Sequence, residues 1–174
     1  RPDLAQVTAR QNLQETAFFH PQLVTDGDGQ VRITFTMPEA LTKWRFLGFA
    51  HDAALRSGTL EGETVTAKDL MVQPNPPRFL REGDVIEFTV KVTNQSDKEQ
   101  SGTARLTLAD SATQKDATAS LGISAPDQDF KIPAKESRPL SWRLTVPDGA
   151  GFLTYKAVAS CGDLTDGEEG WLPV

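Results

Sequence analysis

Apolar and polar residues alternate one by one over residues 85–94, and this period of two constrains the fold more than any other pattern in the chain. The apolar members are Ile86, Phe88, Val90 and Val92, and the polar members are Glu87, Thr89, Lys91 and Thr93. Such alternation is typical of a half-buried strand. No segment shows a sustained helical period. The sequence therefore predicts an all-β protein built from antiparallel sheets.

Residues 73–174 carry enough strand signals for one complete domain. Apolar alternation returns at 104–108 and 140–146, and weaker or shorter apolar runs cover 119–123, 152–161 and 168–172. Turn residues such as Pro147-Asp148-Gly149 separate them. About seven strands at this spacing predict an immunoglobulin-like or fibronectin III-like β-sandwich.

Residues 1–72 read as a partial sandwich of about four strands. The stretch 26–51 offers a glycine-rich turn, an alternating strand, a break at Pro38-Glu39 and a second strand that contains Trp44-Arg45-Phe46, and it predicts a hairpin-like unit. The first of these strands would direct one apolar face inward, formed by Val31, Ile33, Phe35 and Met37. Further strands are predicted at 15–21 and 64–72. The proline-rich run that starts at Gln73 places the domain boundary there.

Composition excludes several classes of protein. With 38% hydrophobic residues, nine Phe and three Trp, the chain has enough apolar material for real cores. A net charge of -6 with scattered Lys and Arg argues against nucleic acid as a partner. No apolar run approaches the roughly 20 residues of a membrane-spanning helix, and no signal peptide is recognisable. Because the chain begins at Arg1, it is expected to be a piece of a longer polypeptide.

Catalytic and metal chemistry is not expected. His20 and His51 are the only histidines, and each stands at the end of a predicted strand without a converging nucleophile or second ligand. Asp26 and Asp28 resemble the start of a calcium loop, but its later ligands are absent, which favours a hairpin turn. No enzyme, cofactor or metal site is predicted.

The single cysteine, Cys161, rules out an internal disulfide and is predicted to be buried and inert. Asp163, Asp166 and Glu168 follow it, and these anions are expected to raise its pKa. Asn94-Gln95-Ser96 matches a glycosylation acceptor, a pattern that also arises by chance.

The three tryptophans raise a different possibility, a sugar-binding platform. Trp142 alternates in phase with Leu140 and Leu144, so it is predicted to be core. Of Trp44, Trp142 and Trp171, only Trp171 is expected to be easily exposed.

Four motifs together resemble the alpha-2-macroglobulin family, in particular its bacterial branch. They are Arg10-x-Asn12-Leu13-x-Glu15-Thr16-Ala17-Phe18-Phe19, the stretch from Leu23 to Arg45 with Phe35-Thr36-Met37-Pro38 and Thr42-x-Trp44-Arg45, Pro77-Arg78-Phe79-Leu80-Arg81-Glu82-Gly83-Asp84, and Asp166-Gly167-Glu168-Glu169-Gly170-Trp171-Leu172-Pro173-Val174. The resemblance implies that 1–72 are the strands of a sixth macroglobulin-like domain that follow the protease bait region. It implies that 73–174 form the whole seventh domain.

The same resemblance implies a function. The chain would be a non-catalytic scaffold segment of a protease trap, with proteases as targets of the full-length parent and a periplasmic, cell-envelope or secreted location. Half a sandwich should expose an apolar face, so self-association through the first module is expected. Many family members carry a thioester built from Cys-x-Glu-Gln, but Cys161-Gly162-Asp163-Leu164 lacks both the Glu and the Gln, so no thioester is predicted.

One alternative from another class stays open. The chain would then be an immunoglobulin-like adhesion or carbohydrate-binding module of a bacterial surface protein, using Trp171 and the loops.

Overall fold

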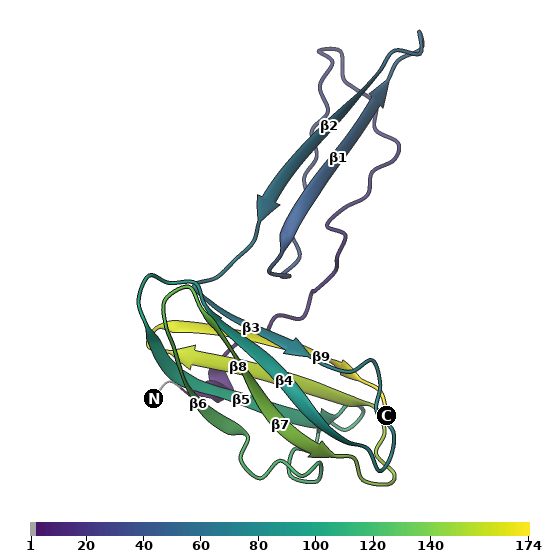
Figure 1. The fold of residues 1–174 in the computed structure, drawn as a ribbon. Coiled ribbons are helices and arrows are strands. Elements are labelled where there is room, and N and C mark those ends of the chain that lie inside the picture. The colour runs from purple at the N-terminus through teal and green to yellow at the C-terminus, as the bar shows by residue number, and fades with distance from the viewer. Residues whose placement is uncertain (1–2) are drawn as a thin grey trace. The chain divides into compact units, whose positions relative to one another are not determined.

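The structure, a computed structural model, describes residues 3–174 and contains nine strands, one 3-10 turn and no α-helix within them. The chain divides into two compact units (Figure 1). Unit 1 combines the residues up to Gln11 with Ala67–Val174, and unit 2 is Asn12–Thr66. Unit 2 is thus an insertion in the sequence of unit 1.

Unit 1 is a sandwich of two antiparallel sheets (Figure 1). One sheet has the order β3-β4-β7, with strands Leu70–Asn75, Val85–Asn94 and Ser137–Thr145. The other has the order β6-β5-β8-β9, with strands Asp127–Ile132, Gln100–Asp110, Leu153–Cys161 and Leu164–Leu172. The all-β fold and the seven-stranded sandwich predicted from the alternating pattern are confirmed.

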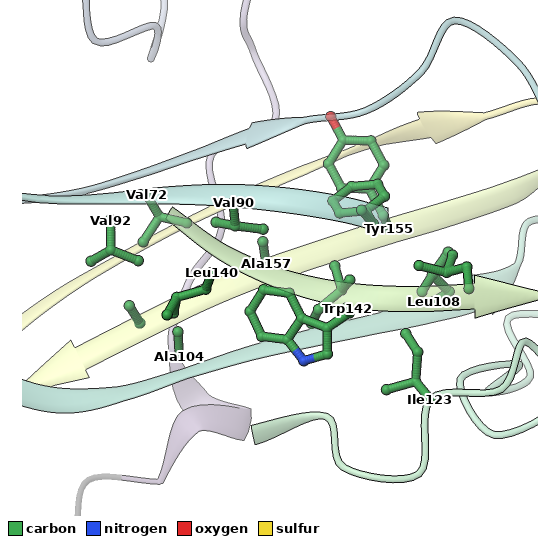
Figure 2. Close-up of a cluster of buried hydrophobic side chains, with 14 of the residues drawn as sticks. Val72, Val90, Val92, Ala104, Leu108, Ile123, Leu140, Trp142, Tyr155 and Ala157 are labelled. Atoms are coloured by element: carbon green, nitrogen blue, oxygen red, sulfur yellow. The ribbon is translucent and has the colours of Figure 1, made fainter. Parts of the chain in front are cut away.

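The core of unit 1 lies between the two sheets, where the alternating side chains of both meet (Figure 2). Phe88 of β4 and Tyr155 of β8 meet across the interface with ring centroids 5.4 Å apart and ring planes tilted by 56°. Trp142 of β7 is buried, as predicted, and its Nε1 donates to the Pro126 carbonyl over 3.0 Å. Large rings therefore fill the centre without leaving a buried donor unpaired.

Residues 4–10, called the strap below, cover the outer face of the four-stranded sheet. The strap begins with the 3-10 turn Leu4–Gln6, in which the Ala5 N–H donates to the Asp3 carboxylate. Leu4 and Val7 pack on Val158 of β8. The strap then runs parallel to β9, since Arg10 bridges to Glu168.

Unit 2 is built around one long hairpin, β1 (Lys43–His51) paired with β2 (Ser57–Val65). The Asp52 carboxylate closes the connecting turn by accepting from the backbone of Ala54 and Arg56. The prediction of a strand that contains Trp44 to Phe46 is therefore confirmed. Its partner, however, is β2, which was not predicted as its pairing strand.

The predicted strand at 31–37 is wrong, because these residues make no backbone hydrogen bonds in the described structure. Their alternation nonetheless orients side chains, since Phe35 packs on Phe18 with centroids 4.4 Å apart. Alternation specifies which side chains meet apolar neighbours, but a strand also needs a backbone edge within hydrogen-bonding distance. No such edge reaches this segment.

Three smaller differences concern the positions of predicted strands. Residues 15–21 and 119–123 form no strand, and the predicted strand at 64–72 is divided between the end of β2 and the start of β3. Unit 2 accordingly has two strands rather than about four. The predicted boundary between residues 72 and 73 falls inside β3, and the assignment of the two parts to numbered family domains stays a prediction.

Unit 2 has almost no interior of its own. Among its residues only Pro38 is buried. Phe18 joins Phe35 and Phe46 in a small, half-buried aromatic cluster. Many other apolar side chains are exposed: Phe19, Leu23, Val24, Val31, Leu47, Phe49, Leu55, Leu60 and Val65.

Candidate functional site

The Cys161 thiol ends β8 and points into the sandwich core, as predicted. Burial raises the pKa of this thiol, so the predicted direction is right. The cause differs from the expected one, because desolvation rather than the neighbouring carboxylates is responsible. A buried, protonated thiol is a poor nucleophile.

A cavity of about 420 Å³ opens beside the end of β8, on the outer side of the sheet. Asp3 and the first strap residue, Leu4, line one wall, and Thr103 and Arg105 of β5 line another. Ser160 of β8 also lines this cavity and is 3% exposed. Its hydroxyl has no hydrogen-bond partner among the described residues. This hydroxyl is the polar atom in the sandwich that most needs a water molecule or a ligand.

The floor of the cavity is a polar row between β5 and β6. Arg105 donates from Nε and Nη2 to the two carboxylate oxygens of Asp127 over 2.6 and 2.8 Å. The Thr103 hydroxyl donates to Asp129 over 2.7 Å. These groups are already engaged with one another, so the cavity presents a satisfied surface rather than a set of open ligands.

A second polar centre is fully buried at the edge of the sandwich, between β9 and β3. Asp166 of β9 is 0% exposed and accepts hydrogen bonds from Arg10, Lys68 and the Val72 backbone. Burial raises the pKa of the neighbouring Glu168 carboxyl, against the opposing effect of Arg10. The sequence pointed to Asp166 as a neighbour of Cys161 and as the first residue of the C-terminal family motif, but it did not predict this centre.

The signal for it was weak. Arg10 begins the first motif that resembles the alpha-2-macroglobulin family, but nothing local marks Asp166, 156 positions away, as its partner.

The residues weighed above as candidates for catalysis or metal binding do not come together in the described structure. His20 and His51 are both exposed, and each has an aromatic neighbour, Phe18 at 5.5 Å and Phe49 at 5.9 Å. Asp26 closes a turn by accepting from the N–H groups of Asp28 and Gln30. Within residues 3–174, no group of three or more His, Cys, Asp or Glu side chains is arranged to bind a metal ion.

Two further side chains were considered above, Trp171 for sugar binding and Asn94 for glycosylation. Trp171 is 68% exposed on the outer face of β9, as predicted. Asn94 is fully buried, and its Nδ2 donates to the carbonyls of Lys98, Ile132 and Pro133. The amide nitrogen that glycosylation would modify is thus occupied inside the fold.

None of the helical turns in residues 3–174 has the length and apolar character of a membrane span.

Comparison with known proteins places the chain in a family. Residues 16–108 match the sequence profile of the Alpha-2-macroglobulin family. The chain belongs to this family.

Its sequence relatives are bacterial. Over 172 residues, 98% of this chain, it is 27% identical to an alpha-2-macroglobulin of Thermotoga maritima. Over 92 residues, 53% of this chain, it is 34% identical to an alpha-2-macroglobulin homolog of a Nostoc species. The chain spans only 10% and 5% of the length of these two relatives.

Solved structures agree at the level of the fold. An Escherichia coli alpha-2-macroglobulin activated by porcine elastase superimposes with a TM-score of 0.68 at 19% identity, over 94% of this chain and 15% of that one. A Salmonella alpha-2-macroglobulin mutant gives a TM-score of 0.58 at 22% identity, over 87% of this chain and 10% of that one. The chain is accordingly a segment of an alpha-2-macroglobulin-like protein.

Proposed function

We propose that the chain is a non-catalytic scaffold segment of a protease trap, in which unit 2 supplies the post-bait strands of a sixth macroglobulin-like domain and unit 1 the seventh. The observation that carries this proposal is the contrast between the two units. Unit 1 has a packed core, whereas unit 2 buries only Pro38 and exposes a series of large apolar side chains. A module of this kind is stable when other strands cover it.

Target proteases belong to the whole protein in this proposal. The Escherichia coli alpha-2-macroglobulin of similar fold was activated by porcine elastase, a protease. By extension, cleavage of a bait segment outside these residues would move the domains of the parent, and the present segment would transmit or accommodate that movement. A periplasmic, cell-envelope or secreted location is part of the same proposal.

The thioester chemistry of many family members is assigned elsewhere in the parent, if the parent has it. Cys161 is followed by Gly162-Asp163-Leu164, and its thiol packs in the core of unit 1. A thioester to this sulfur would need a Gln side chain as the acyl donor where Leu164 stands.

The test uses a large protein substrate and trypsin, because a trap excludes large substrates from a captured protease. We expect the 174-residue chain to leave the rate of substrate cleavage unchanged at any dose. The full-length parent is the positive control and should protect the substrate. Dose-dependent protection by the segment alone would overturn the scaffold assignment.

Self-association is expected of the isolated chain, since unit 2 has apolar side chains without cover. Light scattering over a range of concentrations should show the average mass rising. A monodisperse monomer at high concentration would contradict this expectation.

The exposed Trp171 supports the alternative, a carbohydrate-binding or adhesion module. Titration of the chain with soluble polysaccharides, followed by Trp fluorescence, separates the two proposals. Saturable quenching that is lost in Trp171→Ala would favour the alternative.

A further inference from the structure

The strongest unassigned feature is the buried carboxylate of Asp166. It accepts from Arg10 Nε over 3.1 Å, Arg10 Nη2 over 3.2 Å, Lys68 Nζ over 2.9 Å and the Val72 N–H over 2.8 Å. An isolated charge in this position would be strongly destabilising, so the four donors are what makes its burial tolerable. Two segments of the chain supply them, the strap and residues 68–72.

Arg10 binds the backbone of β3 as well as Asp166. Its Nη2 also donates to the Val72 carbonyl over 2.7 Å, and its side chain is 7% exposed. Both backbone groups of Val72 are therefore bonded to charged side chains. Since β3 is the edge strand of its sheet, these are groups that a further strand would otherwise pair with.

The backbone of the strap is held at the same place. Arg10 N donates to the Gly167 carbonyl over 2.8 Å, and Glu169 N donates to the Arg10 carbonyl over 3.0 Å. A Cβ on Gly167 would lie 2.8 Å from a Val158 methyl and 3.1 Å from the Ala157 carbonyl oxygen, so glycine lets β9 pack closely on β8, while Ala9 Cα of the strap would be in ordinary contact at 3.4 Å. The end of the strap is thus closely fitted to β9.

Two of the residues that donate to Asp166 flank unit 2 in the sequence. Unit 2 begins at Asn12 and ends at Thr66. Arg10 precedes its first residue by two positions, and Lys68 follows its last by two. The two segments of unit 1 that lead into and out of unit 2 are consequently bonded to one carboxylate.

We propose that Asp166, Arg10 and Lys68 form a charged latch that fixes both connections of unit 2 to the sandwich and closes the edge of β3. When the latch is broken, the strap and the start of β3 loosen together, while the rest of the sandwich keeps its packing.

A charged centre fixes the alignment of the strap more specifically than an apolar cluster would. An apolar cluster of similar volume would stabilise the edge as well, but it would accept alternative alignments of the strap. The exposed pair Glu99 and Lys131 offers a contrast within the same unit, because both side chains are more than half exposed and neither lines the cavity beside the strap.

Hydrogen exchange followed by mass spectrometry tests the latch in the 174-residue chain. Asp166→Asn keeps the shape of the side chain and removes its charge. We expect amides of residues 4–10 and 68–72 to exchange about tenfold faster or more, with β4 and β7 unchanged. Glu99→Gln, which removes an exposed charge outside that cavity, is the matched control and should leave both segments as they are.

A second variant keeps the test decisive if Asp166→Asn fails to fold. Lys68 has a side chain that is 43% exposed, so Lys68→Met should be tolerated. Faster exchange is expected in residues 68–72 alone, because Arg10 still binds Asp166. Unchanged exchange there, or equal acceleration throughout β4 and β7, would overturn the proposal.

Discussion

Single residues in unit 1 show how little free space the sandwich leaves. Gly102 lies on β5, between β6 and β8. A Cβ built on it would overlap the Ser160 carbonyl oxygen and would lie 2.8 Å from Cys161 Cβ and from the Phe130 ring. These neighbours belong to the backbone and to a buried ring, which cannot move aside as the end of a flexible side chain could.

Gly102→Ala should therefore lower the free energy of unfolding by about 2–3 kcal/mol, the usual cost of overpacking. Urea denaturation followed by Trp fluorescence measures it. Gly151→Ala is the matched control, because a Cβ there meets nothing within 4 Å. Equal stability of the two variants would show that the strands can separate locally at little cost.

Asn94 is a second residue whose role is visible only in the fold. Besides its three donated hydrogen bonds, its Oδ1 accepts from the backbone and hydroxyl of Ser96. The side chain thus joins the loop after β4 to the end of β6.

Asn94→Asp should cost about 3 kcal/mol, since a carboxylate would face three carbonyl oxygens without a donor. Thermal unfolding near neutral pH measures this loss. The same chemical change at the exposed neighbour, Gln95→Glu, should have little effect. If both variants melt alike, the amide donors of Asn94 do not contribute to stability.

Tyr155 gives a prediction about pH. It is the only tyrosine in the chain, and burial raises its pKa to about 12, with a smaller contribution from Glu168. The unfolded phenol ionises near pH 10. Because the folded value is higher, the stability gained from the neutral phenol is complete below about pH 10 and is lost as the pH rises towards 12.

Ultraviolet difference spectroscopy of tyrosinate can follow this single group. The native chain should titrate well above the chain in concentrated urea. Coincident titrations in both solvents would contradict the burial of Tyr155.

At the scale of strands, two segments with the same alternating pattern have different fates. Residues 85–94 form β4, which was predicted with the same bounds, because β3 and β7 pair with it on either side. Residues 31–37 form no strand, because no edge is available to them. Periodicity is local information, whereas pairing depends on distant segments. The same limit hid the Arg10 and Asp166 pair.

Hydrogen exchange should distinguish these two segments directly. Amides of residues 31–37 are expected to exchange at the earliest labelling times, whereas those of β4 should be protected. Peptides from β1 serve as an internal reference for unit 2, since β1 is paired with β2. Protection of 31–37 comparable to that of β1 would mean that a ladder forms in solution.

At the scale of the whole molecule, the two units differ so much in burial that they should not unfold together. Unit 2, with Pro38 as its only buried residue, should unfold at lower urea concentration than unit 1. Trp44 lies in unit 2, and Trp142 and Trp171 lie in unit 1. Fluorescence should therefore report two transitions.

The variant Trp44→Phe assigns them. It should abolish the fluorescence change at low urea and leave the later one in place. A single transition in both proteins would show that the units stabilise each other enough to unfold as one.

The insertion of unit 2 also determines when the sandwich can close during protein synthesis. The strap is made first and β9 last, so Arg10 leaves the ribosome about 156 residues before Asp166, the partner that neutralises it. Contacts so distant in sequence form late and at a high entropic cost. Until then the nascent chain carries an unattached strap and an open β3 edge, which makes this interval the period in which the growing polypeptide is most exposed to mispairing.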